Sequence, residues 1–195
     1  MFGREFTQAD VEAYQGTEPL VTLVSRIGVS RGWAPESEVH MSGYKKMHKA
    51  MHIFIWSPDR REILIKFNRS GESEDMWSSI GTHVYYAEDY YAAAVRELNT
   101  KLGLGLSIKA AQNRMRFLFY QEASIGTKME HIRVYSFVLN SGEVIKSKEP
   151  LITLPFDSIK YSLHKVDLSV APVFRMLLSK FTRDFTTSLK WRDML

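Results

Sequence analysis

The sequence contains no cysteine among its 195 residues. This absence excludes disulfide bonds, zinc–thiolate sites and a cysteine nucleophile. A chain without cysteine is typical of a reducing compartment, and we expect a cytoplasmic protein. No apolar run approaches the roughly 20 residues that a membrane helix requires. The first residues, MFGREFTQADVEAYQ, also lack the apolar segment of a signal peptide, so we expect no membrane partner.

Runs of like charge are missing as well. Lysine and arginine total 26 residues against 22 for aspartate and glutamate, which gives a formal net charge of +4. The basic residues are spread along the chain, with some enrichment at residues 175–192. This mild excess suits an anionic ligand such as a phosphate, but it is too diffuse to predict nucleic-acid binding.

Linkers, internal repeats and low-complexity stretches are absent too, and the composition is that of a globular domain. Strands are expected at residues 19–29, 49–57, 62–69, 115–123 and 131–139, with a further extended stretch at 76–84. Helices are expected at residues 87–102, at 156–164 and after Pro172, and a polar loop should reach about residue 46. Strands interleaved with helices favour an α+β or α/β layered domain.

We divide the chain into three parts. Residues 1–45 form an N-terminal strand and arm, residues 46–182 the main domain, and residues 183–195 a C-terminal helical extension. The extension carries apolar side chains that pack either on a partner subunit, in a homodimer, or on their own domain. They are Phe185, Leu189, Trp191 and Leu195.

Residues 81–104, GTHVYYAEDYYAAAVRELNTKLGL, carry a motif at fixed spacing. They resemble the Nudix box: Gly, five residues, Glu, seven residues, then Arg-Glu-aliphatic-x-Glu-Glu-x-Gly-aliphatic. The matching residues are Glu88, Arg96, Glu97, Leu98, Gly103 and Leu104, while Thr82 fills the first glycine position. The resemblance implies a Nudix-type α/β/α sandwich with a mixed β-sheet.

The resemblance extends beyond the box. HKAMHIFIW, ILIKFNRS and MWSSIGTHV occur in the order seen in the branch of this superfamily that includes type I isopentenyl-diphosphate isomerase. That branch implies metal ligands at His48, His83 and Glu130. Ile132 and Lys101, however, occupy positions where the branch has glutamates, and its cysteine is missing.

The box itself departs from the family pattern. In Nudix hydrolases three glutamates hold magnesium from one helical face, because positions i, i+3 and i+4 lie together. The corresponding residues are Glu97, Thr100 and Lys101. The Lys101 ammonium repels a divalent cation, and two negative charges are lost. The sequence therefore predicts that magnesium-dependent hydrolysis is impaired or lost, with Mg²⁺ or Mn²⁺ bound weakly or not at all.

Three functions remain open. The first is recognition of a phosphorylated small molecule, a nucleoside diphosphate or another diphosphate, in which Lys101 replaces the missing metal charge. Its ligand-binding residues would be Arg96, Lys101, Arg69 and His83. The third function, which needs neither phosphate nor metal, is that of a non-catalytic protein-interaction subunit; the second is described next.

The second function is an active diphosphate hydrolase or isomerase-like enzyme with a relocated metal site. Its catalytic residues would be Glu97 and Glu88, and its metal ligands Glu97, His83 and Glu130. The first function is favoured over this one, because Lys101 preserves affinity for an anion while removing the catalyst.

These residues also have structural explanations. Lys101 is otherwise a solvated lysine, and Arg96 and Glu97 otherwise anchor the helix. His48 and His52 lie roughly 13 Å apart on a strand, so at most one joins His83 and Glu130 in a transition-metal cluster; otherwise they pack or hydrogen-bond. An aromatic run either stacks on a nucleobase or covers the sheet edge. It comprises Trp77, Tyr85, Tyr86, Tyr90 and Tyr91.

Overall fold

The computed structural model describes residues 14, 16–40, 46–68, 76–125, 128–162, 169–186 and 195. Nine strands within these ranges join one sheet. They are β1 (Leu20–Val24), β2 (Ser30–Pro35), β3 (His48–Trp56), β4 (Glu62–Asn68), β5 (Met76–Ser78), β6 (Ile80–His83), β7 (Met115–Ile125), β8 (Lys128–Val138) and β9 (Leu151–Pro155). The helices are α2 (Glu36–Val39), α3 (Tyr90–Leu102), α4 (Ile108–Arg114), α5 (Phe156–Ser162) and α6 (Pro172–Phe185).

Strand β3 is the centre of the sheet. One of its edges pairs in parallel with β8 along the whole strand, from His48 opposite Glu130 to Trp56 opposite Val138. Its other edge is shared by three antiparallel strands in succession, namely β1, β6 and β4. A strand that is paired on both edges and covered on both faces is apolar almost throughout, and the sequence of β3 follows this rule.

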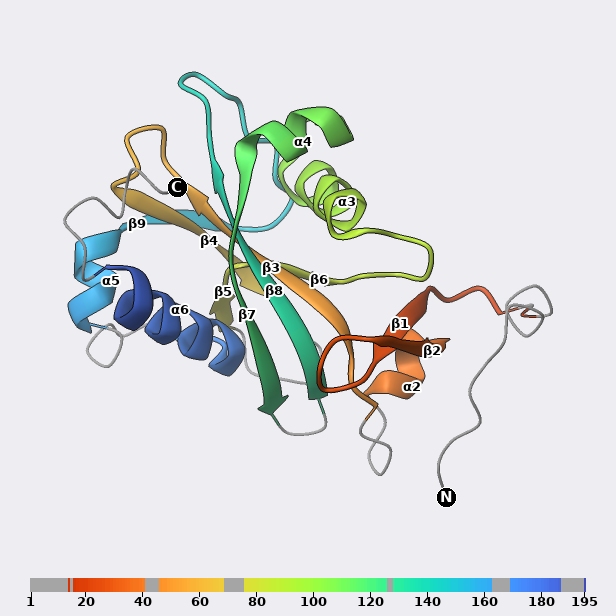
Figure 1. Ribbon diagram of the computed structural model, residues 1–195. Helices are drawn as coiled ribbons and strands as arrows, with labels where there is room; N and C mark the ends of the chain where they lie inside the picture. Colours follow the sequence, from red (N-terminus) through yellow and green to blue (C-terminus); the bar gives the residue numbers. More distant parts are fainter. Residues whose placement is uncertain are drawn as a thin grey trace.

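Helices cover both faces of the sheet, as Figure 1 shows. On one face, Leu98 and Leu102 of α3 pack in a cluster with Ile53 of β3. On the other face, the rings of Phe174 and Phe181 in α6 meet the ring of Phe54 edge-on. The predicted α/β/α sandwich with a mixed sheet is therefore confirmed.

Helix α3 has a well-defined beginning and end. The side chain of Asp89 caps it by accepting a hydrogen bond of 2.7 Å from the backbone N–H of Ala92. The helix begins at Tyr90 instead of the predicted residue 87, because Ala87 has a φ of 63° and belongs to the preceding turn. At the other end Gly103 adopts the left-handed conformation and donates its N–H to the carbonyl of Asn99.

Several elements differ from the predictions. The expected strand at residues 19–29 ends at Val24, and the expected polar loop contains β2 and α2. These elements were missed because β2 (SRGWAP) has little apolar alternation and is ordered by pairing with β1. Helix α4 and strand β9 were missed as well, since α4 is only two turns long and starts at the Ser107 cap.

The terminal parts are only partly described. Strand β1 joins the main sheet where Leu23 pairs with His48, so this part of residues 1–45 belongs to the same sheet. Most of the expected C-terminal extension lies outside the described residues, although Leu195 is buried in the core cluster that includes α6. None of the helices in the described ranges is long and apolar enough to cross a membrane.

The end of α3 generates a stability prediction. Gly103 and Gly105 share a φ of 63°, but a Cβ at Gly103 would lie 2.9 Å from the Cβ of Lys146, whereas one at Gly105 would meet nothing within 4 Å. We expect Gly105→Ala to lower the free energy of unfolding by roughly 1 kcal/mol through backbone strain alone. Gly103→Ala should lower it by roughly 2 kcal/mol or more, because the clash adds to the strain. Urea denaturation measures both values, and equal losses would contradict the packing described.

Candidate functional site

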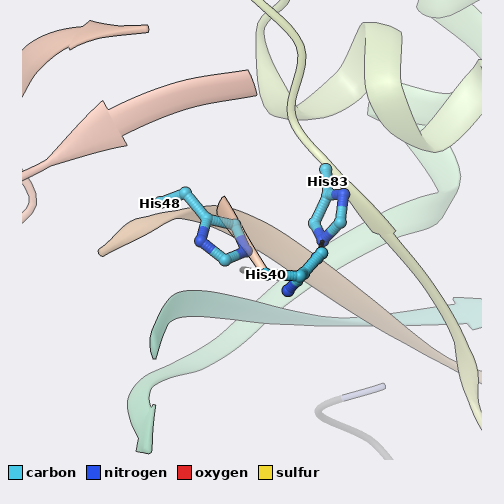
Figure 2. A group of neighbouring side chains, drawn as sticks. All are labelled: His40, His48 and His83. Atoms are coloured by element: carbon cyan, nitrogen blue, oxygen red, sulfur yellow. Dashed lines mark hydrogen bonds between the residues drawn. The ribbon is translucent and has the colours of Figure 1, made fainter. Parts of the chain in front are cut away.

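Three histidines from separate elements meet at one end of the sheet. His48 begins β3, His83 ends β6, and His40 directly follows α2. Figure 2 shows their rings turned toward one another. One nitrogen from each ring lies within 4.8 Å of the others, and Nε2 of His40 lies 3.1 Å from Nε2 of His83.

Glu130 adds a carboxylate to this group. It lies directly opposite His48 in the parallel pair, and its Oε1 is 3.8 Å from Nε2 of His48 and 3.9 Å from Nε2 of His83. Both distances exceed a hydrogen bond, so the carboxylate faces the rings without closing on them. Burial alone would raise the pKa of Glu130, but the imidazoles of His48 and His83 outweigh it. The pKa lies far below its ordinary value, and the carboxylate is charged.

Two further groups orient the rings. Nδ1 of His48 lies 3.0 Å from the carbonyl oxygen of Lys46, to which it donates, and Nδ1 of His83 lies 2.8 Å from Oε1 of Glu36. Both rings therefore direct Nε2 toward the centre of the group. Burial lowers the pKa of His83, but Glu130 and Glu36 more than compensate and the pKa is raised.

A transition-metal ion suits this group chemically. His48 is fully buried, and its Nε2 has no hydrogen-bond partner among the described residues. A buried nitrogen without a partner is costly, and a metal ion would satisfy it. Imidazole nitrogens beside one carboxylate form a donor set for zinc, iron or manganese. The residues fit such an ion.

The box residues form a second cluster, which does not fit magnesium. The ammoniums of Lys66 and Lys101 each donate to one oxygen of Glu149, at 2.9 Å in both cases. Burial raises the pKa of Glu97, against the opposing effect of Lys101, and Thr100 is exposed. Two cations thus neutralise two carboxylates, and no negative charge is left over to hold a divalent cation.

Arg96 links the box helix to the histidine site. It forms a two-point pair with Glu88, at 2.7 and 3.0 Å, and also donates to the backbone carbonyl of His83 at 2.9 Å. Its guanidinium lies over the ring of Tyr85, 4.0 Å from the centroid. Arg96 and Glu88 therefore hold the segment that carries His83 against the helix.

The structure separates the residues that the sequence grouped together. His83 and Glu130 lie together at the histidine site, whereas Glu97 and Lys101 belong to the cluster around Glu149. Arg69 lies outside the described residues. Glu88, expected to be catalytic in the enzyme hypothesis, is engaged by Arg96.

The sequence analysis missed His40. It also left open whether His48 or His52 lies beside His83, and the structure places His48 there. His40 lies in the stretch expected to be a polar loop, where no motif or strand spacing relates it to His48. His52 is directed elsewhere, and its Nδ1 lies 2.8 Å from Oγ of Ser79. In the sequence, the acidic residues Glu36 and Glu38 are a local feature that favours a helix start before His40, and the structure has the short helix α2 there.

This arrangement, with the box helix against one face of a mixed sheet, is a Nudix-type fold. DR0079 from Deinococcus radiodurans has a similar structure, with a TM-score of 0.63 and 12% identity over 83% of this chain and 98% of that chain. A MutT NUDIX hydrolase from Burkholderia pseudomallei has a TM-score of 0.52 and 19% identity, over 69% of this chain and 97% of that chain. The Escherichia coli ORF135 protein has a TM-score of 0.54 and 15% identity, over 73% of this chain and 94% of that chain. Identities this low show the fold alone. No protein-family model matches the chain, and no curated protein matches its sequence.

The link between helix and histidine site can be tested through stability. Side chains of Arg96 and Glu88 are only 28% and 19% exposed, so Arg96→Met should leave a poorly solvated carboxylate and lower the free energy of unfolding by roughly 2 kcal/mol. The double variant Arg96→Met/Glu88→Gln should lose less than the two single variants combined. Urea denaturation of the unaltered chain, the two single variants and the double variant measures the four free energies of unfolding. A loss no larger than that of Arg61→Met, at a side chain 79% exposed, would contradict the anchoring role.

Proposed function

We propose that the chain is a Nudix-fold metalloprotein that holds a divalent transition-metal ion at the histidine site and acts there on a diphosphate-type small molecule. The observation that carries this proposal is the convergence of His40, His48 and His83, whose nitrogens lie within 4.8 Å of one another. The charged carboxylate of Glu130 beside them supplies a counter-charge. The ligand class rests on the fold, which is shared with a MutT NUDIX hydrolase.

The residues around the site have distinct tasks in this proposal. Such an ion, when bound, polarises a phosphoryl oxygen and lowers the pKa of a coordinated water. Glu36 and the carbonyl of Lys46 keep the two imidazoles of His83 and His48 in the orientation and tautomer that a ligand needs. Glu130, charged and near both rings, supplies negative charge to a bound cation, whereas its low pKa makes it a weak proton acceptor.

The box helix has an architectural task in the same proposal. Its remaining arginine is bound to Glu88 and to the carbonyl of His83, and its former metal face is neutralised by Lys101 and Lys66. Helix α3 therefore holds the histidine site in place instead of holding magnesium itself. This division of roles favours the relocated metal site over the box as the reactive centre.

Metal binding is the first test. Protein stripped with EDTA should bind one Zn²⁺, Mn²⁺ or Co²⁺ per chain in isothermal titration calorimetry. His48→Ala should weaken binding by about 100-fold, because losing even an outer partner of a metal ligand costs roughly 10–100-fold. His52→Ala is the matched control, since it removes a histidine of the same strand that faces Ser79. Equal affinities in the two variants would overturn the metal site.

The ligand class is tested separately on the metal-loaded protein. Nucleoside diphosphates, nucleotide sugars and prenyl diphosphates should raise its melting temperature, and at least one should be converted. If the ion binds but none of these compounds binds or reacts, the metal site is supported and the proposed ligand class is rejected.

A second function, metal-free recognition of a diphosphate by Lys101, is supported by a different observation. Two ammoniums, those of Lys66 and Lys101, converge on the carboxylate of Glu149. Both are cations that pair well with phosphate oxygens. Because Glu149 already occupies them, an anionic ligand would have to displace this carboxylate.

Glu149→Gln tests that second function. Removing the competing negative charge should strengthen the binding of inorganic pyrophosphate in the presence of EDTA by about tenfold. Glu143→Gln is the matched control, because Glu143 lies on the same connecting segment but pairs with Arg114. Calorimetry that finds no pyrophosphate binding in any variant would exclude recognition at Lys101.

A further inference from the structure

Aromatic and basic side chains gather along the paired strands β7 and β8. They come from β3, α3, β7 and β8 and are far apart in the sequence. The members are Lys49, Tyr90, Phe117, Tyr120, His131 and Arg133, and we call them the cation–aromatic patch.

Strand register places these residues on one face of the sheet. Lys49 lies opposite His131, and Tyr120 lies opposite Arg133. Residues two apart on a strand share a face, so the patch continues the face that α3 covers at Tyr135. In Figure 1, α3 and α4 lie toward the end where β7 begins, and the opposite end of the β7–β8 hairpin extends past them.

The cations of the patch lie over aromatic rings. The guanidinium of Arg133 is 4.4 Å from the centroid of the Tyr90 ring and 6.0 Å from that of Phe117. The ammonium of Lys49 lies 5.9 Å from the same Tyr90 ring. These contacts hold two positive charges at one place on the surface.

These two charges have no ion-pair partner in the part of the chain that the structure describes. Among the described residues, neither Lys49 nor Arg133 has a carboxylate within ion-pair distance. The acid that shares this face, Glu122, lies opposite His131. A ligand anion would relieve the repulsion between Lys49 and Arg133.

Two rings of the patch are open to solvent. Tyr120 is 61% exposed and stacks on His131, with centroids 5.6 Å apart and planes at 11°, and Phe117 is 52% exposed. Exposed apolar side chains are informative where they lie close together, as these two rings do beside two cations. Each ring offers a face on which a flat group can stack.

We propose that the cation–aromatic patch binds single-stranded nucleic acid, with phosphates at Lys49 and Arg133 and bases stacked on Tyr120 and Phe117. Stacking platforms beside cations are what a single strand requires, and base stacking tolerates any sequence. Both open rings lie on β7, three residues apart, so they offer two separate stacking positions, which suits an extended strand better than a single nucleotide. Basic residues are spread along the sequence, which argued against nucleic-acid binding. The fold, however, brings Lys49 and Arg133 together at the ring of Tyr90.

This site is distinct from the histidine site and does not rest on the proposed function. Lys49 follows His48 directly on β3, so the two side chains point to opposite faces of the strand. Binding of a single strand can therefore be measured in EDTA, without any contribution from a bound metal.

Fluorescence anisotropy of a labelled oligouridylate, titrated with the full chain in EDTA, tests the proposal. Tyr120→Ala and Phe117→Ala should each weaken binding about tenfold through lost stacking. In the double variant Lys49→Gln/Arg133→Gln, the slope of log K against log salt should fall by about 1.4, because each phosphate contact on a single strand contributes about 0.7. Circular dichroism establishes that each variant is folded, and Tyr120→Ala, at an exposed position, carries the test if the double variant is not.

Arg61→Gln and Tyr86→Ala are the controls, since each removes an exposed charge or ring outside the patch, and both should bind like the unaltered chain. Three results would overturn the proposal: no binding at low salt, equal binding by the patch variants and the unaltered chain, or competition by a free mononucleotide as effective as that by the oligonucleotide.

Discussion

The parallel pairing of β3 with β8 is the constraint on which both sites depend. Backbone hydrogen bonds fix the register, so His48 must face Glu130 and Lys49 must face His131. A shift of one residue would exchange the two faces of β3 and place the imidazole where the ammonium now lies. The apolar residues further along β3, such as Phe54 and Ile55, pack in different core layers and prevent that shift.

The architecture around helix α3 does not depend on a metal. The two-point pair of Arg96 with Glu88 and the hydrogen bond to the carbonyl of His83 are made entirely by groups of the protein. The apolar side of α3 is likewise independent of its polar side, because Leu98 and Leu102 only face the sheet. Helix α3 can therefore position the segment that ends β6 whatever its polar side binds.

The sequence predicted the parts of the fold that have strong local patterns. The apolar run at the end of β3 and the helical spacing of α3 were readable because burial dictates them, and the glycine end of α3 was readable because a left-handed residue favours glycine. Strand β2 and helix α2 were not, since their order comes from tertiary pairing. The site divides in the same way. His83 and Glu130 were predicted through a motif, but His40 became visible only when α2 folded back beside β6.

Adjacent residues on one strand explain why a single fold can carry two unrelated sites. On β3, the buried His48 faces two partly buried imidazoles, and its own nitrogen without a hydrogen-bond partner favours a metal ion. Lys49 faces the opposite side, near the beginning of α3 at Tyr90, where cations and rings lie at the surface. Burial selects for ligation on the first face, and exposure permits stacking on the second. The alternation of side chains along a strand keeps the two chemistries apart, so a change in either face need not disturb the other.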